Sequence, residues 1–461
     1  MYLPTTSLAR LSLFALSATA LPNAVNHATP PISIQMAQSI ISRNQGILTS
    51  QTDSSALLQA GFTQKTFRQI LSTYTNNSLA PTLNAYIVKS VDSVVPVVSN
   101  ATRDTTYPLD RLSSGNGLLR LWQETGDEKY KRAFEALRKS VDLQPRNDQG
   151  GRWYYVYPYW SYLDGMFSLT PFLAAYTNDV GYSSMTEQTL EDMIFQLDLL
   201  WQRCYSQETG LLVHGYDARR TAVWANSATG ASPHVWGRSL GWYCMALIDT
   251  LELLPANASH ARQYIESRFQ QLMPAVVAAA DGKTGAWWQV MDRPGEQGNY
   301  LESSASSMFV YALLKGVRLG ALSTDAAWNA TASYSGGQNA YVDVAKKAYK
   351  YIADTFVVHN GNGTLGWNGT VGVCSLNSTA SYEVSDGRVQ QTLSMLTRRD
   401  SIMWDSRLST TVHWDRWPLS GQVWRLKDWL SKAAGQVRGG RRCLNVLAFT
   451  KAAVCGQKKQ T

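Results

Sequence analysis

The chain has 461 residues, 44% of them hydrophobic, so it can bury a large core as one big domain or two ordinary ones. Five cysteines are too few for a disulfide scaffold, and none has metal-ligand spacing; Cys204 and Cys244 are one candidate pair that spacing alone does not establish. The net charge of +8 arises in the last segment, where residues 384–461 hold 14 basic and 5 acidic side chains and the remainder holds 28 and 29. The charge therefore gives no reason to expect that the main domain binds nucleic acid or a membrane.

The first 20 residues have the pattern of a secretory signal. Arg10 supplies the positive charge, residues 11–16 the apolar run, and Ala18-Thr19-Ala20 a small-x-small cleavage site. The run is too short to span a bilayer, and no later stretch is long enough. Glycan-acceptor sequons also favour a secreted, extracellular glycoprotein, with each acceptor on the surface. Seven are present, at Asn76, Asn100, Asn257, Asn329, Asn362, Asn368 and Asn377.

Beyond residue 30, apolar residues recur at helical spacing over most of the chain, and no stretch is long enough to build a sheet. The predicted helices cover residues 34–48, 55–75, 80–97, 110–124, 127–143, 161–177, 186–205, 238–254, 258–280, 302–320 and 339–357. A tight Thr125-Gly126 turn makes the fourth and fifth of them an antiparallel hairpin.

Four connecting loops resemble one another, because each places a glycine shortly before an aromatic residue or histidine. These loops are Gly150-Gly-Arg-Trp153, Thr209-Gly-Leu-Leu-Val-His214, Thr284-Gly-Ala-Trp-Trp288 and Gly363-Thr-Leu-Gly-Trp367. A repeat of one or two helices with a loop facing the substrate predicts helical hairpins in a solenoid or a closed ring. With eleven predicted helices, the natural closed form is an all-α, six-hairpin (α/α)6 barrel that is one helix short.

The missing helix falls where the composition changes, after Glu383. Residues 384–461 are basic and weakly patterned, and only 422–434 is helix-capable. This tail is either disordered or the result of a misplaced exon boundary, and we favour the second. We therefore expect a signal peptide over 1–20, a barrel over 30–383 with its twelfth helix missing or altered, and an atypical tail over 384–461.

Residues 153–169 gather aromatic side chains around a single carboxylate, Asp164, which a glycine follows. Aromatic faces suit sugars, because C–H groups stack on the ring while the hydroxyls stay solvated. Burial among such rings is expected to raise the pKa of Asp164 towards that of a usable acid. The alternative is an aromatic core segment with a capping aspartate.

Further motifs occur in a specific order along the chain. They are Asp110-Arg-Leu, Thr125-Gly-Asp-Glu-Lys-Tyr130, Tyr157-Pro158, Leu163-Asp-Gly-Met-Phe167, Leu212-Val-His-Gly-Tyr-Asp217, Val235-Trp-Gly-Arg-Ser-Leu-Gly-Trp242, Trp288-Gln-Val-Met-Asp-Arg-Pro294 and the segment from Gly298 to Arg318. The set resembles the unsaturated rhamnogalacturonyl hydrolases, glycoside hydrolase family 105, and the related unsaturated glucuronyl hydrolases, over roughly residues 30–383.

The resemblance implies an α/α barrel that acts on lyase-generated oligosaccharides, here from pectic rhamnogalacturonan. Such enzymes hydrate the C4=C5 double bond of an unsaturated uronic acid at the non-reducing end, unlike ordinary two-carboxylate glycosidases. We expect no metal and no cofactor, because no phosphate loop, His/Cys cluster or nucleotide motif is present. The sequence does not indicate an oligomeric state.

The resemblance also implies which residues act on the substrate. Asp164 matches the general acid/base, and Asp110 matches a second acidic residue that helps to bind substrate, although its local sequence also fits a helix N-terminus. His214 matches an active-site histidine that hydrogen-bonds the uronate or the attacking water; a lone histidine in a loop is more often structural.

The remaining candidates bind sugar. The planar guanidinium of Arg238 is suited to clamp the uronate carboxylate. Trp236 and Trp242 are expected to stack on sugar rings, as is Tyr162, which stands where the family usually has Trp. The alternative is a buried aromatic helix start with a surface arginine.

The chain departs from the family on the side of the leaving sugar. Tyr154 and Tyr155 stand where the family commonly has a His-Lys pair, and Trp160 stands where it commonly has Pro-x-Gln. These changes put direct recognition of rhamnose in doubt. Two rival functions remain: a conventional inverting glycosidase on the same barrel, and a non-catalytic sugar-binding barrel.

Overall fold

The structure is a computed structural model that describes residues 30–49, 55–179, 184–323 and 340–371. All eleven predicted helices are present in it, whereas the predicted signal peptide, the tail and the helix over 422–434 lie outside the described residues. The helices are α1 (Ile32–Ser42), α2 (Ala56–Thr73), α3 (Ala80–Val94), α4 (Ala101–Asp104), the 3-10 helix η1 (Leu109–Ser114), α5 (Gly115–Thr125), α6 (Glu128–Asp142), α7 (Met166–Asp179), α8 (Ser184–Cys204), α9 (Gly237–Leu253), α10 (Ser259–Ala278), α11 (Ser303–Arg318) and α12 (Ala340–Thr355).

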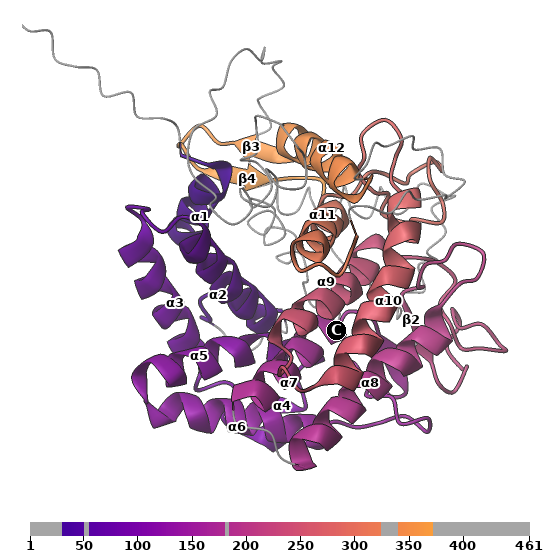
Figure 1. Cartoon of the computed structure of the whole chain (residues 1–461), viewed down its shortest axis with the longest axis horizontal. Helices are drawn as coiled ribbons and strands as arrows, with labels where there is room; N and C mark the ends of the chain where they lie inside the picture. Colours follow the sequence, from indigo (N-terminus) through magenta and orange to yellow (C-terminus); the bar gives the residue numbers. More distant parts are fainter. Residues whose placement is uncertain (1–29, 50–54, 180–183, 324–339, 372–461) are drawn as a thin grey trace, which may run out of the picture.

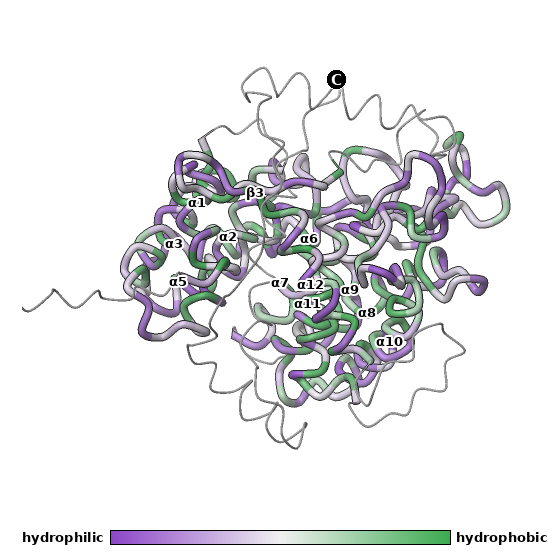
Figure 2. Tube along the Cα trace, turned by 90° about the horizontal axis from the view of Figure 1, so that it is seen from above, coloured by the Kyte–Doolittle hydropathy of each residue, from purple (hydrophilic) through white to green (hydrophobic). Residues whose placement is uncertain are grey.

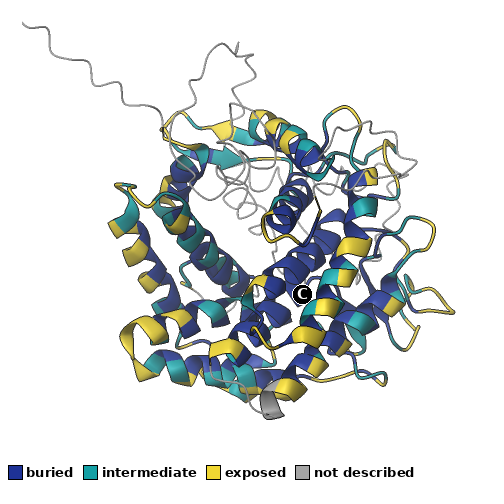
Figure 3. Cartoon of the chain, viewed as in Figure 1, coloured by how far each residue is buried: buried dark blue, intermediate teal, exposed yellow. Residues whose placement is uncertain are grey.

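The helices form two concentric layers (Figure 1). The inner layer follows the chain in the order α2, η1 with α5, α7, α9 and α11, and successive members pack against each other. In α9 every residue from Gly237 to Leu251 is buried, as expected for a helix surrounded by protein on all sides. Outer helices bury one stripe; α6, for example, buries Tyr130, Phe134, Leu137 and Val141. Exposed residues therefore lie on the outer helices and the loops (Figure 3), where the hydrophilic stretches also concentrate (Figure 2).

The two ends of the described chain meet in this ring. Strands β3 (Val357–His359) and β4 (Leu365–Trp367) form an antiparallel hairpin after α12. The backbone of Leu365 in this hairpin accepts from Arg43 Nη1 at 3.0 Å and donates to Ser39 Oγ in α1 at 2.8 Å. The predicted α/α-barrel fold is confirmed. The twelfth barrel helix, predicted to be missing or altered, falls on residues outside the described ranges.

The predicted helix over 161–177 is wrong at its start, as is the prediction of no sheet. Residues Trp160–Tyr162 form strand β1, which pairs antiparallel with β2 (Gly215–Asp217) in a register that places Tyr162 opposite Gly215. Helix α7 begins only at Met166. The spacing of the aromatic residues is compatible with either period, and it was the distant pairing partner that decided for a strand.

The four similar loops occupy equivalent positions. Each follows an outer helix, namely α6, α8, α10 or α12, and its glycine has a positive φ of 84°, 70°, 77° or 78° at Gly150, Gly210, Gly285 and Gly363. This left-handed conformation is readily adopted only by glycine, so the repeated residue serves a repeated turn. The first three of these loops lead towards the N-terminal ends of the inner helices α7, α9 and α11.

The thiols of Cys204 and Cys244 are buried and free, so the candidate disulfide is wrong. Among the described residues no helix is both long and apolar enough to cross a bilayer. Five sequon asparagines are described, and all five are exposed, as predicted for glycan acceptors: Asn76, Asn100, Asn257, Asn362 and Asn368. Asn329 and Asn377 lie outside the described ranges.

A buried ion network crosses the barrel near the C-terminal ends of α9 and α11. Asp249, 4% exposed, pairs with Lys65 of α2 and, at 2.6 Å, with Lys315 of α11. Burial by itself would raise the pKa of Asp249, but the two ammonium groups outweigh it and lower the pKa to about 2. The carboxylate therefore ties three inner helices together.

We expect Asp249→Asn to lower the free energy of unfolding by about 3 kcal/mol at neutral pH, because Lys65 loses its ion pair and the buried Lys315 keeps only its pair with Glu252 at 2.6 Å. Because the folded pKa lies below the unfolded value of about 3.9, this stabilisation is present above about pH 4 and is lost as the pH falls towards 2. Urea unfolding of both proteins at neutral and acidic pH measures it. Asp148→Asn, which changes an exposed aspartate, is the control. Equal stability of the Asp249→Asn and wild-type chains at neutral pH would contradict this prediction.

Candidate active site

The pairing of β1 with β2 brings two predicted site residues together. Asp164 lies in the turn between β1 and α7, and His214 directly precedes β2. The backbone N–H of Leu163 donates to the carbonyl of His214 at 3.2 Å, so the segments run side by side. His214 Nε2 then lies 3.3 Å from Asp164 Oδ2. The two residues are 50 positions apart in sequence and are brought together by a two-stranded sheet with three residues in each strand.

The carboxyl group of Asp164 is 8% exposed and well supplied with donors. Its Oδ2 accepts a hydrogen bond from Ser239 Oγ, in the first turn of α9, in addition to the contact with His214. Burial alone would raise the pKa of Asp164, but the His214 and Ser239 contacts and the charge of Arg238 outweigh it and lower the pKa below its ordinary value. The predicted rise in pKa is therefore wrong, because the polar neighbours come from segments distant in sequence.

Asp110 is in the opposite situation. It lies in the first turn of η1, is 2% exposed, and accepts a hydrogen bond of 2.8 Å from Tyr154 Oη to its Oδ2. Burial raises the pKa of Asp110 to about 7; the Tyr154 hydrogen bond opposes this rise, and the nearby charge of Asp164 adds to it. Two carboxyl groups with pKa values displaced in opposite directions are the usual arrangement for a paired acid and base.

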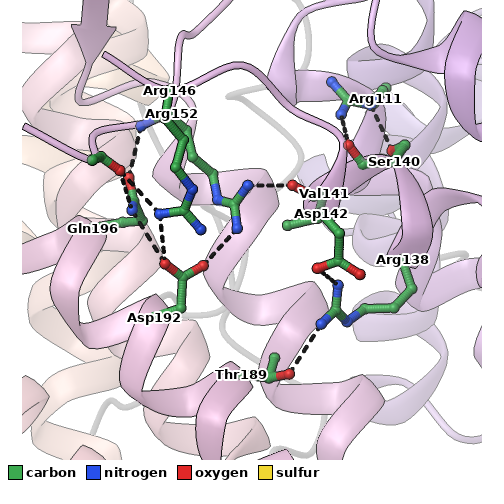
Figure 4. Close-up of polar contacts among 11 residues, drawn as sticks. Arg111, Arg138, Ser140, Val141, Asp142, Arg146, Arg152, Thr189, Asp192 and Gln196 are labelled. Atoms are coloured by element: carbon green, nitrogen blue, oxygen red, sulfur yellow. Dashed lines mark hydrogen bonds and ion pairs between the residues drawn. The ribbon is translucent and has the colours of Figure 1, made fainter. Parts of the chain in front are cut away.

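The next residue, Arg111, anchors Asp110 to the outer layer. Its side chain is fully buried, with Nε 3.1 Å from Ser140 Oγ in α6 (Figure 4). Its Nη2 lies 2.8 Å from Gln144 Oε1, just after α6. Its Nη1 also donates to the carbonyl of Tyr107 at 3.0 Å. These contacts fix the short 3-10 helix, so the position of Asp110 is set by its neighbour in sequence.

Aromatic rings surround His214. The Tyr162 ring meets the imidazole edge-on at 5.2 Å between centroids, and Trp236 is stacked with it at 6.1 Å. Both rings belong to a separate hydrophobic cluster next to the main core, with half-buried aromatic side chains packed around it. These partly exposed rings are Tyr154, Tyr157, Trp160, Trp224 and Tyr300. The site thus has an accessible aromatic wall of the kind that sugars contact.

Arg238 and Trp242 lie deeper. Arg238 is 3% exposed, and its Nη1 donates to the carbonyl of Val371. The Trp242 ring packs against Phe167 at 4.5 Å and against Phe62 at 5.8 Å, within the main hydrophobic core. Asp110, Asp164, His214, Trp236, Arg238 and Tyr162 are gathered at one end of the barrel, whereas Trp242 forms part of the core.

Two contributors were missed from sequence. Ser239 lies inside a recognised motif but had no assigned role, and Tyr154 stood out only as a departure from the family. Neither has a local signal, because each acts on a carboxylate that another segment supplies. Among the described residues, no group of three or more His, Cys, Asp or Glu side chains is placed to hold a metal ion.

Comparison with known proteins identifies the family. Residues 35–395 match Glycosyl Hydrolase Family 88. The chain belongs to this family. A family 105 glycoside hydrolase of C. acetobutylicum ATCC 824 is 32% identical, with a TM-score of 0.65 over 78% of this chain and 93% of the other. The resemblance to families 105 and 88 is therefore confirmed, and the chain is a glycoside hydrolase.

Two further relatives widen the comparison. The unsaturated glucuronyl hydrolase of Bacillus sp. GL1, described as responsible for glycosaminoglycan degradation, shares the fold at 13% identity, with a TM-score of 0.51 over 73% of this chain and 86% of the other. Protein Atu3128 of Agrobacterium fabrum is 39% identical over 170 residues, which cover 37% of this chain and 68% of that protein.

We expect Ser239→Ala to raise the pKa of Asp164 by about one unit. The lost hydrogen bond stabilises only the ionised carboxylate, and a bond to a charged group is worth about 1.5–3 kcal/mol, against about 1.4 kcal/mol per pKa unit. Carbon-13 NMR titration of aspartate carboxyl groups measures it. Ser307→Ala, which removes a buried hydroxyl bonded within α11, should leave the pKa of Asp164 unchanged. An unmoved pKa in Ser239→Ala would disprove the assigned contact.

Proposed function

We propose that this glycoside hydrolase removes a C4=C5 unsaturated uronic acid from the non-reducing end of lyase-generated oligosaccharides, by hydrating the double bond. The observation that carries the proposal is the pair of buried carboxyl groups, Asp110 and Asp164, with pKa values displaced in opposite directions. The pair lies beside an aromatic wall and a buried arginine.

Hydration needs a proton for C4 and a base for the water that attacks C5. Near neutral pH, Asp110 retains a proton in part of the molecules, whereas Asp164 is ionised. The π electrons of the double bond take the Asp110 proton to form the C4–H bond, and the water oxygen bonds to C5. One water proton passes to Asp164 and the other stays on the new C5 hydroxyl, and exchange with solvent restores both carboxyl groups. The sequence-based expectation gave both roles to Asp164; its lowered pKa favours dividing them.

The product of hydration is a hemiketal at C5. Its ring opens to a ketone at C5, and the C1 carbon then releases the neighbouring sugar as an alcohol. No displacement at the anomeric carbon by a protein carboxylate is involved, which separates this chemistry from that of ordinary glycosidases.

The other predicted site residues have places in this scheme. His214 Nε2 lies 3.3 Å from Asp164 Oδ2 and can orient the attacking water. Arg238 would clamp the uronate carboxylate with its planar guanidinium. Tyr162 and Trp236 form the buried centre of the aromatic cluster whose partly exposed rings would meet the sugar. Trp242, which packs against Phe167 in the main core, would act only through that packing.

The leaving sugar is proposed to come from pectic rhamnogalacturonan. The resemblance to family 105 and the 32% identity to the C. acetobutylicum family 105 hydrolase support this substrate. Tyr154 contacts Asp110 instead of the side predicted for the leaving sugar, so only Tyr155 is proposed to alter the surface that meets that sugar. The signal pattern and the five exposed sequon asparagines support a secreted glycoprotein.

The proposal predicts that the wild-type chain bleaches the ultraviolet absorbance of an unsaturated rhamnogalacturonan disaccharide, because hydration destroys the conjugated double bond. Asp164→Asn should abolish the bleaching while binding is largely kept. Bleaching of other unsaturated uronides alone would reassign the leaving sugar. Release of sugar from saturated substrates would favour the inverting glycosidase. If the wild-type and Asp164→Asn chains both bind the oligosaccharide without turnover, the result would favour the non-catalytic barrel.

The two carboxyl groups also predict a bell-shaped pH dependence of kcat/KM. Activity should fall as the pH rises through about 7, because Asp110 loses its proton. It should fall again in acid, below the ordinary pKa range of aspartate, as Asp164 becomes protonated. A profile that rises through pH 7 would contradict the role of Asp110 as proton donor.

For Arg238→Ala we expect weaker binding of the uronate, by about 2–3 kcal/mol for a charge-assisted bidentate contact. Arg238→Lys should recover only part of it, since an ammonium cannot present two parallel donors. Steady-state kinetics on the unsaturated disaccharide provide the measurement. Unchanged kinetic constants in Arg238→Ala would rule out the clamp.

A further inference from the structure

We infer that Tyr154 is a positioning residue that determines which oxygen of Asp110 carries the proton given to the substrate. The inference rests on the proposed hydration reaction.

The hydrogen bond between Tyr154 and Asp110 has a defined direction. Tyr154 Oη lies 2.8 Å from Asp110 Oδ2. Burial, together with the negative charges of Asp110 and Asp164, raises the pKa of the Tyr154 phenol well above its ordinary value, so the phenol keeps its proton and donates it. An oxygen that accepts this bond is the poorer place for a second proton. The protonated Asp110 therefore carries its own proton on Oδ1, the oxygen that Tyr154 does not occupy.

Backbone contacts hold Tyr154 between the two segments it serves. Its carbonyl accepts from the N–H of Leu109, next to Asp110, at 2.9 Å, and its own N–H donates to the carbonyl of Trp160 in β1 at 3.0 Å. Two residues earlier, Arg152 pairs with Asp192 of α8 at 2.6 Å, and the Arg152 backbone donates to Gln196 (Figure 4). The tyrosine is thus fixed by the outer layer and not carried on a free loop.

The glycine after Asp164 makes room for this tyrosine. A Cβ atom on Gly165 would lie 3.2 Å from Tyr154 Cδ2 and 2.9 Å from Leu109 Cδ1, closer than ordinary van der Waals contact. The Tyr154 ring also packs on Tyr162 at 4.7 Å between centroids. A single ring therefore lies against the segments of both carboxyl groups and couples their positions.

A tyrosine at this place differs chemically from a histidine. A histidine at this place would titrate near its ordinary pKa of about 6.5. Both its charge and the number of N–H groups it can donate would then change over the pH range in which the enzyme works. The phenol of Tyr154 stays neutral and remains a donor throughout. It holds Asp110 in the same orientation whether Asp110 is protonated or not.

The test is Tyr154→Phe in the full chain, read by carbon-13 NMR titration of Asp110, with Asp110→Asn assigning the signal. The hydrogen bond stabilises the ionised carboxylate, so its loss should raise the pKa of Asp110 by about one unit. Tyr155→Phe removes the hydroxyl of the adjacent residue, whose ring packs against Tyr157. It should leave the pKa of Asp110 unchanged. An unmoved pKa in Tyr154→Phe, or an equal shift in both variants, would overturn the inference.

Kinetics give the second readout. In Tyr154→Phe the alkaline limb of the pH profile should move upward with the pKa of Asp110, and kcat at neutral pH should fall about tenfold with KM nearly unchanged, because only proton placement is lost. Tyr154→His should restore a donor and add a second ionisation to the profile. A rise in KM with kcat unchanged would mean that Tyr154 contacts the substrate instead of positioning Asp110. The NMR titration does not need turnover. An inactive wild type would therefore overturn the proposed function, whereas the pKa of Asp110 would still test its contact with Tyr154.

Discussion

The chemistry of this site depends on the unequal supply of hydrogen-bond donors to two buried carboxyl groups. Asp164 accepts a hydrogen bond from Ser239 and lies 3.3 Å from His214 Nε2, whereas Asp110 accepts a hydrogen bond from Tyr154 alone. Both groups are almost fully desolvated, so burial raises both pKa values, and the hydrogen bonds together with the neighbouring charges separate them. A barrel end where several helices begin can deliver donors to one carboxylate and withhold them from its neighbour.

The barrel architecture makes that asymmetry possible. Inner helices such as α9 are buried along almost their whole length, so the packing of the core fixes the position of their first turns. Ser239 and Arg238 lie on the first turn of α9, and Asp164 on the turn before α7. The far end of the same helices is held by the Asp249 ion network. Catalytic groups and structural charges are thus kept at opposite ends of α9.

Local sequence was informative where the determining contacts are local. The Thr125-Gly126 turn was predicted and is present, with Gly126 in the left-handed conformation at the end of α5. The helical spacing of apolar residues, the repeated glycine loops and the number of helices also led to the barrel. The same reasoning placed Tyr162 in a helix, although it lies in β1, because its pairing partner comes from the segment after α8.

The sequence by itself determined the helical architecture, the family, and the identities of Asp110, Asp164, His214 and Arg238 as candidates, because helical periodicity and motif order are written in neighbouring residues. Only the tertiary structure decided the electrostatics of the site. The direction of the Asp164 shift and the contact of Tyr154 with Asp110 arise from side chains that meet across the barrel. A pKa depends on every donor and charge within a few ångströms, and sequence spacing does not record those distances.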